Sequence, residues 1–549
     1  MVQENPSRSQ KKKILFIAAI VSVGLISLFS YHSILGYFFT GTDTITLIET
    51  SRIESLKDFA KLFAEPLMAG SKFIDVAKFF RPISSLSYSL DYAIWGLSPF
   101  GFQLTNLLLN TFVAILVITV MLRLSSGDLL FAWLSGLIFA LHPILIESVP
   151  ATDRRHDLIA AVFLLLSLWF FLKSRKSNLD YKWSIFLSLI FYILALGGKE
   201  IAVILPAIIF CQVLFFSKES SWPGKLISSL KITSPFIVIT SAYLSWRTVV
   251  LGGLGGYTRT DPWEYADIYH YLINLFHNYF IDLLYPSDPW GVLDCCYANW
   301  WTLVMLSFFT FYLGLYLVGS LSGQDSSHRR KSGRLLCFLA SWILAPLLLF
   351  MVTLTFAHRS MYIPVIPFSA LLAYPLAESI RAFWRAGLEY QNTGFRSSGL
   401  LATLKPQGLV LTIGMLLLSY LFIYSPVVRS YDQWEMSGRM GRLILTKLAT
   451  GTTQFTQDCR VNLYNVPECL RSYEKKEPKA KDVTYLSDYS IKSWLNLCGF
   501  HRKLEVVIHS RSRPWDFTGD LSVAMLKLGK ENLRAIVRMK TVRRTSYLW

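Results

Sequence analysis

Residues 14–39 read ILFIAAIVSVGLISLFSYHSILGYFF, an almost unbroken apolar run that follows Arg8 and Lys11–Lys13. A transmembrane helix needs about 20 mostly apolar residues, so this run is long enough to span a bilayer. A cleaved signal peptide has a shorter apolar core, which ends at a small-residue cleavage site. The pattern therefore predicts an uncleaved membrane anchor, with residues 1–13 forming a basic tail in the cytoplasm.

The composition of the whole chain agrees with this start. Of the 549 residues, 53% are hydrophobic and only 16% are charged, and the mean hydropathy is +0.41. Soluble domains carry about 25% charged residues, and a water-exposed surface does not tolerate so much hydrocarbon. Soluble multidomain, disordered, collagen-like and disulfide-framework proteins are thereby excluded. The composition predicts an all-α polytopic membrane protein.

The apolar segments predict about eleven transmembrane helices. The ten that follow the first lie at 102–122, 129–147, 157–172, 183–197, 200–216, 227–246, 301–320, 335–356, 361–380 and 408–428. Eleven crossings from a cytoplasmic start put the basic loops near Lys173, Lys218, Arg329 and Arg381 inside, as the positive-inside rule requires. Counting 269–285 as a further span would move Arg329 outside. We therefore interpret that segment as an external helix, lying on the membrane or partly re-entrant.

Three regions then lie outside: a loop at 40–100 with an amphipathic stretch around 51–80, a loop at 252–300, and residues 431–549. The last region combines a helical pattern with strand patterns at 461–466, 483–486, 504–508 and 535–539. It predicts a small extracytoplasmic α+β domain. Cys459 and Cys469 are close enough in sequence to pair in an oxidising space, and the sequence does not decide their connectivity.

The net charge of +18 would suggest a nucleic-acid partner for a soluble protein. Here Lys and Arg collect in short loops between apolar spans, where they orient the helices. No basic face interleaved with stacking aromatic residues is apparent, so nucleic-acid binding is not predicted.

Ionisable residues near the ends of membrane spans are costly, and they are default candidates for function. Here they form five clusters, and the predicted topology puts all five on the outer face. The clusters are Asp43, Arg81 to Asn106, His142 to Asp157, Lys199-Glu200, and His358 to Pro364. Each of the first three clusters also has a structural alternative. Asp43 is then a helix cap or a solvated loop acid, the 81–106 cluster an aromatic anchor at the membrane interface, and the 142–157 cluster a network of salt bridges.

The side-chain types in these clusters indicate a particular chemistry. Carboxylates take a proton from a hydroxyl, and Arg and Lys hold phosphate, Arg often through two parallel hydrogen bonds. A site at the outer leaflet that binds phosphate and activates a hydroxyl suits a sugar linked through phosphate to a membrane polyprenol.

In these same stretches the chain resembles the multispanning glycosyltransferases of the GT-C superfamily. Within that group it is similar to the membrane part of the transmembrane tetratricopeptide-repeat O-mannosyltransferases and their prokaryotic relatives. The likeness rests on residues 81–106, 142–158, 199–206 and 359–364, in the family's order, and it covers about residues 14–430. The resemblance implies a GT-C-like transmembrane catalytic domain at 14–430, with residues 431–549 where the family carries its repeats.

The resemblance implies that Asp43 is the catalytic base. The family often has two adjacent acids there, whereas Thr42 precedes Asp43 in this chain, and Asn110 stands where the family commonly has His. We predict that four cations bind the donor phosphate: Arg359, Lys199, Arg155 and Arg81. We predict that the sugar or acceptor is positioned by Glu147, Asp157, His142, Glu200, Tyr362 and His358.

The sequence thus predicts a glycosyltransferase (EC 2.4) that moves mannose or another hexose from a polyprenyl-phosphate donor to an acceptor hydroxyl, with inversion. Its partners would be the lipid-linked sugar, membrane lipid, and an acceptor protein or glycan. The scheme requires no cofactor, although the acids are able to bind a divalent metal. The absence of an Asn-x-Ser/Thr sequon favours a bacterial inner membrane over the endoplasmic reticulum.

Two alternatives from other classes remain. One is a transporter or flippase for a lipid-linked or anionic solute, although transporters gather their charges near the bilayer midplane between repeated halves. The other is a non-catalytic scaffold that serves the C-terminal domain, which leaves the outer-face charges without a role.

Overall fold

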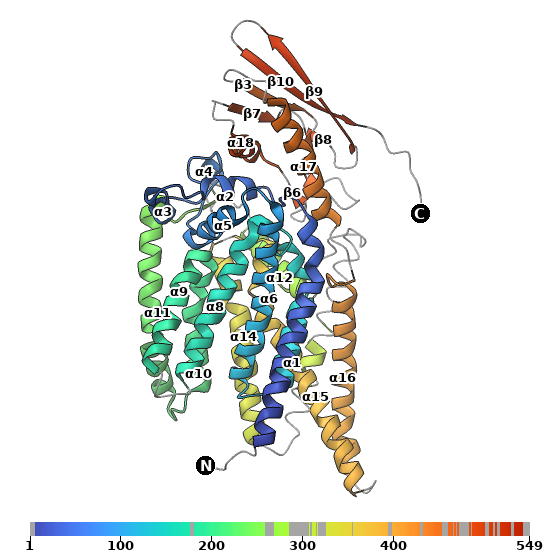
Figure 1. Ribbon diagram of the computed structural model, residues 1–549. Helices are drawn as coiled ribbons and strands as arrows, with labels where there is room; N and C mark the ends of the chain where they lie inside the picture. Colours follow the sequence, from blue (N-terminus) through green and yellow to red (C-terminus); the bar gives the residue numbers. More distant parts are fainter. Residues whose placement is uncertain are drawn as a thin grey trace.

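The structure is a computed structural model. It describes residues 6–175, 181–257, 268–284, 307, 310–314, 316, 326–353, 355–393, 398–428, 432–452, 459–464, 466–467, 469–470, 483–484, 486–499, 504–508, 511–512, 517–528 and 532–541. A bundle of long helices carries a smaller α/β domain at one end (Figure 1). We call that end of the bundle its upper end.

Helices lie at the predicted spans that the described residues cover. They are α1 (Pro6–Tyr31), α6 (Pro99–Leu124), α7 (Leu129–Leu141), α8 (Arg155–Ser174), α9 (Tyr181–Gly198), α10 (Leu205–Phe216), α11 (Trp222–Leu251), α14 (Ser326–Thr353), α15 (Val365–Thr393) and α16 (Ser398–Ile423). Within the described residues, six helical segments are long and apolar enough to cross a membrane. The predicted span at 301–320 falls mostly outside the described residues, so the number eleven stays a prediction.

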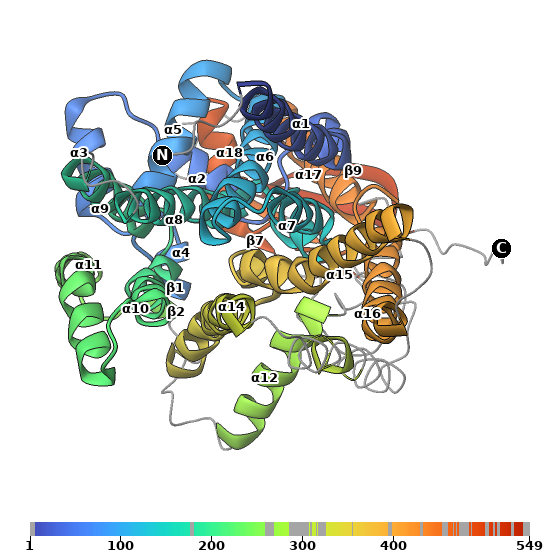
Figure 2. The ribbon, with the colours of Figure 1, turned by 90° about the horizontal axis from the view of Figure 1, so that it is seen from below.

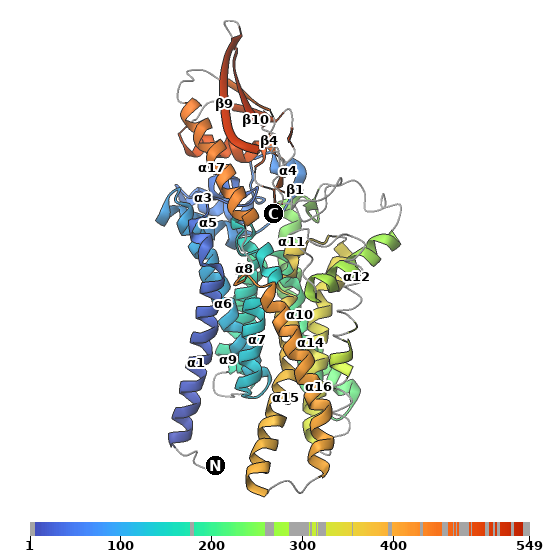
Figure 3. The same ribbon diagram turned by 90° about the vertical axis from the view of Figure 1, so that its right-hand side faces the viewer.

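The helices differ in how deeply they are buried in the bundle. Buried residues make up 72% of the most apolar stretch of Thr152–Ser174 but only 17% of that of Trp222–Leu251. Figure 2 shows the same contrast, with α6, α7 and α8 in the interior and α11 at the periphery. The segment at 269–285 is helix α12 (Ile268–Leu284), which is inclined to the bundle axis in Figure 3.

The upper end of the bundle is covered by the elements between α1 and α6, all of them in the first outer loop except η1, which lies within the predicted first span. They are η1 (His32–Gly36), α2 (Thr44–Thr50), α3 (Leu56–Ala64), α4 (Phe73–Val76), β1 (Ala77–Lys78) and α5 (Pro82–Trp95). Strand β1 pairs antiparallel with β2 (Gly256–Tyr257), with Ala77 opposite Tyr257. This pairing joins the first and second predicted outer loops.

The C-terminal domain contains a four-stranded mixed sheet. Its helices are α17 (Asp432–Thr452) and α18 (Asp488–Leu497), and the sheet order is β7 (Leu504–Ile508), β3 (Cys459–Tyr464), β10 (Asn532–Thr541) and β9 (Phe517–Leu528). Strands β7, β3 and β10 are parallel, and β9 is antiparallel to β10. Short pairs are formed by β4 (Val466–Pro467) with β8 (Arg511–Ser512), and by β5 (Cys469–Leu470) with β6 (Val483–Thr484).

Strands occur at the four positions that the sequence pattern predicted, and β9 was not predicted. The proposed pairing of Cys459 with Cys469 concerns side chains outside the described part of the structure. Cys498 is exposed and carries a free thiol.

Helix α18 fastens this domain to the first outer loop. Ile491 and Leu495 of α18 are buried in the same apolar cluster as Ile48 of α2. Ser493 donates a hydrogen bond to Thr46 Oγ1 at 3.1 Å, and Asn496 donates to Glu49 Oε1 at 2.6 Å. Burial of apolar surface stabilises this contact, and the polar bonds fix its register. The C-terminal domain therefore lies directly beside the residues that follow the first span.

Candidate active site

Asp43 lies at the upper end of the bundle, immediately before α2. It occupies the N-cap position of α2, but its side chain makes no capping hydrogen bond. Instead, Asp43 Oδ1 accepts a hydrogen bond of 2.6 Å from the hydroxyl of Tyr489 in α18. The cap alternative therefore does not account for this carboxylate, which faces the junction with the C-terminal domain.

A second carboxylate, that of Asp153 in η3 (Thr152–Arg154), lies beside Asp43. The backbone N–H of Asp43 donates to Asp153 Oδ2 at 3.4 Å. Gly41 permits this approach, because a Cβ at that position would lie 2.1 Å from Asp153 Oδ1, and its φ of +88° also favours glycine. A second acid thus stands beside Asp43 in space, although Thr42 precedes Asp43 in the sequence.

The environment of Asp43 changes its acidity. Withdrawal from water and the negative charge of Asp153 raise the pKa of Asp43 to about 6, against the lowering effects of the Tyr489 hydrogen bond, Arg359 and Arg154. Burial and the Asp43 charge raise the pKa of Tyr489, so its hydroxyl stays protonated and able to donate. A general base works best when its pKa lies near the operating pH. Asp43 is therefore ionised at neutral pH, yet more basic than an ordinary carboxylate.

Three of the predicted cations lie together with these acids. Arg359, in η6 (His358–Tyr362), interacts electrostatically with Asp43, Asp153, Asp157 and Arg81. We call the group of Asp43, Asp153, Asp157, Arg81, Lys199 and Arg359 the upper charge cluster.

Within this cluster two cations are paired with acids. Lys199 donates a short hydrogen bond to Asp157, and Arg81 donates two to Glu200, at 2.9 and 2.6 Å. Arg359 instead donates to the hydroxyl of Tyr257 at 2.9 Å. Arg359 is therefore the cation best placed to receive an anionic group.

A pair of glycines positions Lys199. A Cβ at Gly197 would lie 2.6 Å from Ile83 of α5, and one at Gly198 would lie 3.0 Å from Ile159 of α8. The two glycines thus let the end of α9 approach both helices closely, which brings Lys199 to Asp157.

Arg155, predicted as a phosphate ligand, has a different position. It is fully buried and forms an ion pair of 2.6 Å with Asp91. It also donates 2.8 Å hydrogen bonds to Asn106 Oδ1 and to the carbonyl of Phe102. The structure therefore does not bring Arg155 into the upper charge cluster, because its guanidinium is occupied in holding α5 and α6 against α8.

The remaining predicted residues hold the surrounding loops. His142 is buried, with Nε2 at 3.0 Å from the carbonyl of Leu283, and Tyr362 donates to Asn110 Oδ1 at 2.7 Å. Glu147 pairs with Arg154 at 2.9 Å. His358 forms a short contact with Asp282 of α12, directly beside Arg359. These side chains fix the loops that carry the cluster and lie outside its centre.

Sequence reasoning missed Asp153 and Arg154 as site residues, and also Tyr257 and Tyr489. The first two belong to the dense charged run between His142 and Asp157, so a signal was present. Nothing in the sequence marks the two tyrosines, since each reaches the site from a distant region. Within the described part of the chain, no three His, Cys, Asp or Glu side chains are grouped to hold a metal.

Comparisons with known proteins confirm the resemblance to protein O-mannosyl-transferases. No family model matches the chain. It is 40% identical over 96 residues to protein O-mannosyl-transferase TMTC2 of Homo sapiens, a match that covers 18% of this chain and 11% of the relative. It is 25% identical over 355 residues to protein O-mannosyl-transferase TMTC4 of Homo sapiens, covering 54% of this chain and 47% of the relative. The matched regions thus span about a tenth and about half of these relatives.

Among solved structures, the chain is similar to ArnT from Cupriavidus metallidurans bound to undecaprenyl phosphate. The similarity covers 93% of this chain and 92% of that chain, with 14% sequence identity and a TM-score of 0.46.

Proposed function

We propose that the chain is an integral membrane glycosyltransferase that moves mannose or another hexose from a polyprenyl-phosphate donor to an acceptor hydroxyl. The observation that carries the proposal is the pair of carboxylates, Asp43 and Asp153, next to Arg359 in the upper charge cluster. This arrangement offers a base and a phosphate-binding cation within one site. The similarity to proteins named O-mannosyl-transferases supports the choice of sugar transfer.

The proposed reaction is a single displacement at the anomeric carbon. Asp43 takes the proton of the acceptor hydroxyl. At the same time the oxygen of that hydroxyl forms the new bond to the anomeric carbon. The bond from carbon to the phosphate oxygen breaks, and its electron pair leaves with the polyprenyl phosphate. This leaving group is already a stable anion, so no acid is needed to protonate it. The configuration at the anomeric carbon is inverted.

The other members of the upper charge cluster support the deprotonation of the acceptor hydroxyl and the departure of the polyprenyl phosphate. Arg359 binds the phosphate directly, and Lys199 and Arg81 add positive charge from their positions on Asp157 and Glu200. Asp153 makes Asp43 more basic, and Tyr489 orients its carboxylate. We propose that these cations neutralise the phosphate without a metal ion.

The proposed location is a bacterial inner membrane, with the N-terminus in the cytoplasm and the upper charge cluster on the extracytoplasmic side. The N-terminal end of α1, whose first turns contain Arg8 and Lys11–Lys13, lies at the end of the bundle opposite the C-terminal domain (Figure 1). The positive-inside rule puts that end in the cytoplasm.

Donor cleavage by the purified protein tests this function against transport. The protein in lipid nanodiscs, which maintain no gradient, is incubated with radiolabelled polyprenyl-phosphate mannose and delipidated cell-envelope extract as the source of acceptor. We expect free polyprenyl phosphate to accumulate as label moves into the water-soluble or envelope fraction. A transporter or flippase leaves the donor intact, and that result contradicts the proposal.

The pH dependence of transfer tests the proposed base. We expect kcat/KM to rise with pH through about pH 6, because only ionised Asp43 takes a proton. Tyr489→Phe removes a hydrogen bond that lowers the pKa of Asp43, so the rising, acidic limb of the pH profile moves to higher pH. Asp153→Asn removes the adjacent negative charge, so the limb moves to lower pH.

The groups that face Asp43 in this experiment are Asp153, Arg154, Arg359 and Tyr489. The measurement is kcat/KM from mildly acidic to mildly alkaline pH for both variants and the wild type. Shifts in the same direction, or an unmoved limb in both variants, show that another group controls the rate.

A further inference from the structure

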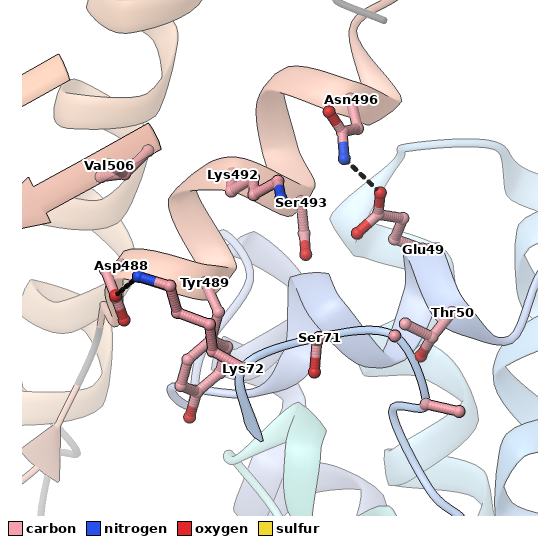
Figure 4. A pocket seen from close by; sticks show the side chains of 12 residues that line it. Glu49, Thr50, Ser71, Lys72, Asp488, Tyr489, Lys492, Ser493, Asn496 and Val506 are labelled. Atoms are coloured by element: carbon pink, nitrogen blue, oxygen red, sulfur yellow. Dashed lines mark hydrogen bonds and ion pairs between the residues drawn. The ribbon is translucent and has the colours of Figure 1, made fainter. Parts of the chain in front are cut away.

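A pocket of about 440 Å³ lies between the C-terminal domain and the first outer loop (Figure 4). One wall is formed by the end of α2 and the turn at 69–72, and the other by α18 and Val506 of β7. Its volume falls within the range of about 300–1,000 Å³ that is typical of small-molecule sites. The fold thus creates a ligand-sized space at the junction of the membrane domain and the C-terminal domain.

The lining of this pocket is polar and balanced in charge. Glu49 and Asp488 supply carboxylates, Lys72 and Lys492 supply ammonium groups, and Asn496 supplies an amide. Lys72 pairs with Asp488 at 3.0 Å and Asn496 donates to Glu49 at 2.6 Å (Figure 4), and the second oxygen of each carboxylate and the other N–H groups are left for a ligand. Carboxylates only accept hydrogen bonds, ammonium groups only donate, and an amide does both. Such a set matches neighbouring hydroxyl groups, each of which donates and accepts. Two acids against two bases give no net charge, which favours a neutral ligand.

Tyr489 connects the pocket to the proposed base. Its ring lines the pocket, and its hydroxyl donates to Asp43 Oδ1 at 2.6 Å. A ligand in the pocket is therefore separated from Asp43 by no more than this side chain. An aromatic side chain is also able to pack against the C–H groups of a sugar ring, while the hydroxyl groups of the sugar bond to polar side chains.

We propose that this pocket is an acceptor subsite, which binds one sugar residue of a neutral glycan next to the residue that receives the transferred sugar. The inference rests on the proposed function, for which it names the class of acceptor. The reacting hydroxyl belongs to the adjoining sugar residue of the same glycan, which extends past Tyr489 to Asp43. A lipid tail does not fit, since among the described residues that line the pocket Ala69 and Val506 alone have aliphatic side chains. A peptide acceptor is the competing outcome of the test below.

Photolabelling without donor tests binding separately from catalysis. The full-length protein in nanodiscs is labelled with a diazirine derivative of methyl mannobioside, and in parallel with a Thr-containing tripeptide amide bearing the same diazirine. Labelled residues are located by peptide mass spectrometry. We expect the disaccharide probe to label α18 and the turn at 69–72, and excess unlabelled methyl mannobioside to suppress the signal.

Two matched variants locate the site. Ala69→Trp places an indole in the pocket, and we expect it to remove the disaccharide labelling. In a transfer assay it should raise KM for methyl mannobioside by about tenfold or more, with KM for the lipid donor unchanged. Ala64→Trp makes the same change at an exposed position at the end of α3, outside the pocket. It should behave as the wild type.

The outcomes separate this inference from the proposed function. Disaccharide labelling in the pocket without any sugar transfer supports the sugar site and overturns the proposed function. Labelling elsewhere, labelling that Ala69→Trp leaves intact, or preferential labelling of the pocket by the peptide overturns the inference. Asp43→Asn should keep the labelling, because it lies beyond Tyr489 and does not line the pocket.

Discussion

Asp43→Asn is expected to lower the rate of sugar transfer by about 10²- to 10⁴-fold, the usual contribution of a general base. Asn has nearly the same shape as Asp, and its amide oxygen still accepts a hydrogen bond from Tyr489. It has no basicity, so it does not take the proton of the acceptor hydroxyl. Since Asp43 does not cap α2, the helix loses no capping bond.

The measurement is the initial rate of transfer by the purified variant at saturating donor. Asp58→Asn is the matched control, because Asp58 is a carboxylate of the same outer loop that bonds to Lys61 and Ser55 on the surface of α3. Donor binding by the two variants should be equal. Turnover of Asp43→Asn within a few-fold of wild type would falsify the assignment of Asp43 as the base.

Arg359→Gln is expected to lower kcat/KM for the lipid donor by about 10²- to 10³-fold, the effect of losing one preorganised donor to a developing anion. Arg81 and Lys199 are held by Glu200 and Asp157, so they do not readily replace it. Arg359→Lys restores the charge but not the planar fork that binds two phosphate oxygens. We expect it to recover only part of the loss.

The rate is measured as a function of polyprenyl-phosphate mannose concentration. Arg439→Gln serves as the control, because the side chain of Arg439 in α17 is 78% exposed and pairs with Glu435 one turn away. Removal of Arg359 also removes a charge that lowers the pKa of Asp43, so the acid limb should move to higher pH. An unchanged kcat/KM for the donor assigns phosphate binding to another residue.

Much of the fold could be predicted because hydropathy and strand patterns are local properties. A span is recognised from its own residues, and helices lie at the predicted spans that the described residues cover. The strand predicted at 504–508 coincides with β7. Strand β9 was missed, since Phe517–Leu528 contains Gly519, Asp520 and Lys527, which weaken the alternating pattern.

The site was predicted less completely, and Arg155 explains why. Arg155 and Asp157 lie two residues apart on α8, which turns by about 100° per residue, so their side chains point in nearly opposite directions. Asp157 faces Lys199, whereas Arg155 faces Asp91 and Asn106. The charged stretch at 142–158 contains both residues. Only the rotation of α8 against its neighbouring helices decides that Asp157, and not Arg155, reaches the upper charge cluster.

The sequence by itself determined that this is a polytopic membrane protein with charged residues gathered at the ends of its spans, because transfer into a bilayer depends on composition along the chain. Tertiary structure alone decided that Asp153 stands beside Asp43 and that Tyr489, 446 positions away, donates a hydrogen bond to it. Such contacts arise from the packing of distant segments, and a carboxylate acquires its basicity only from the groups that packing places around it.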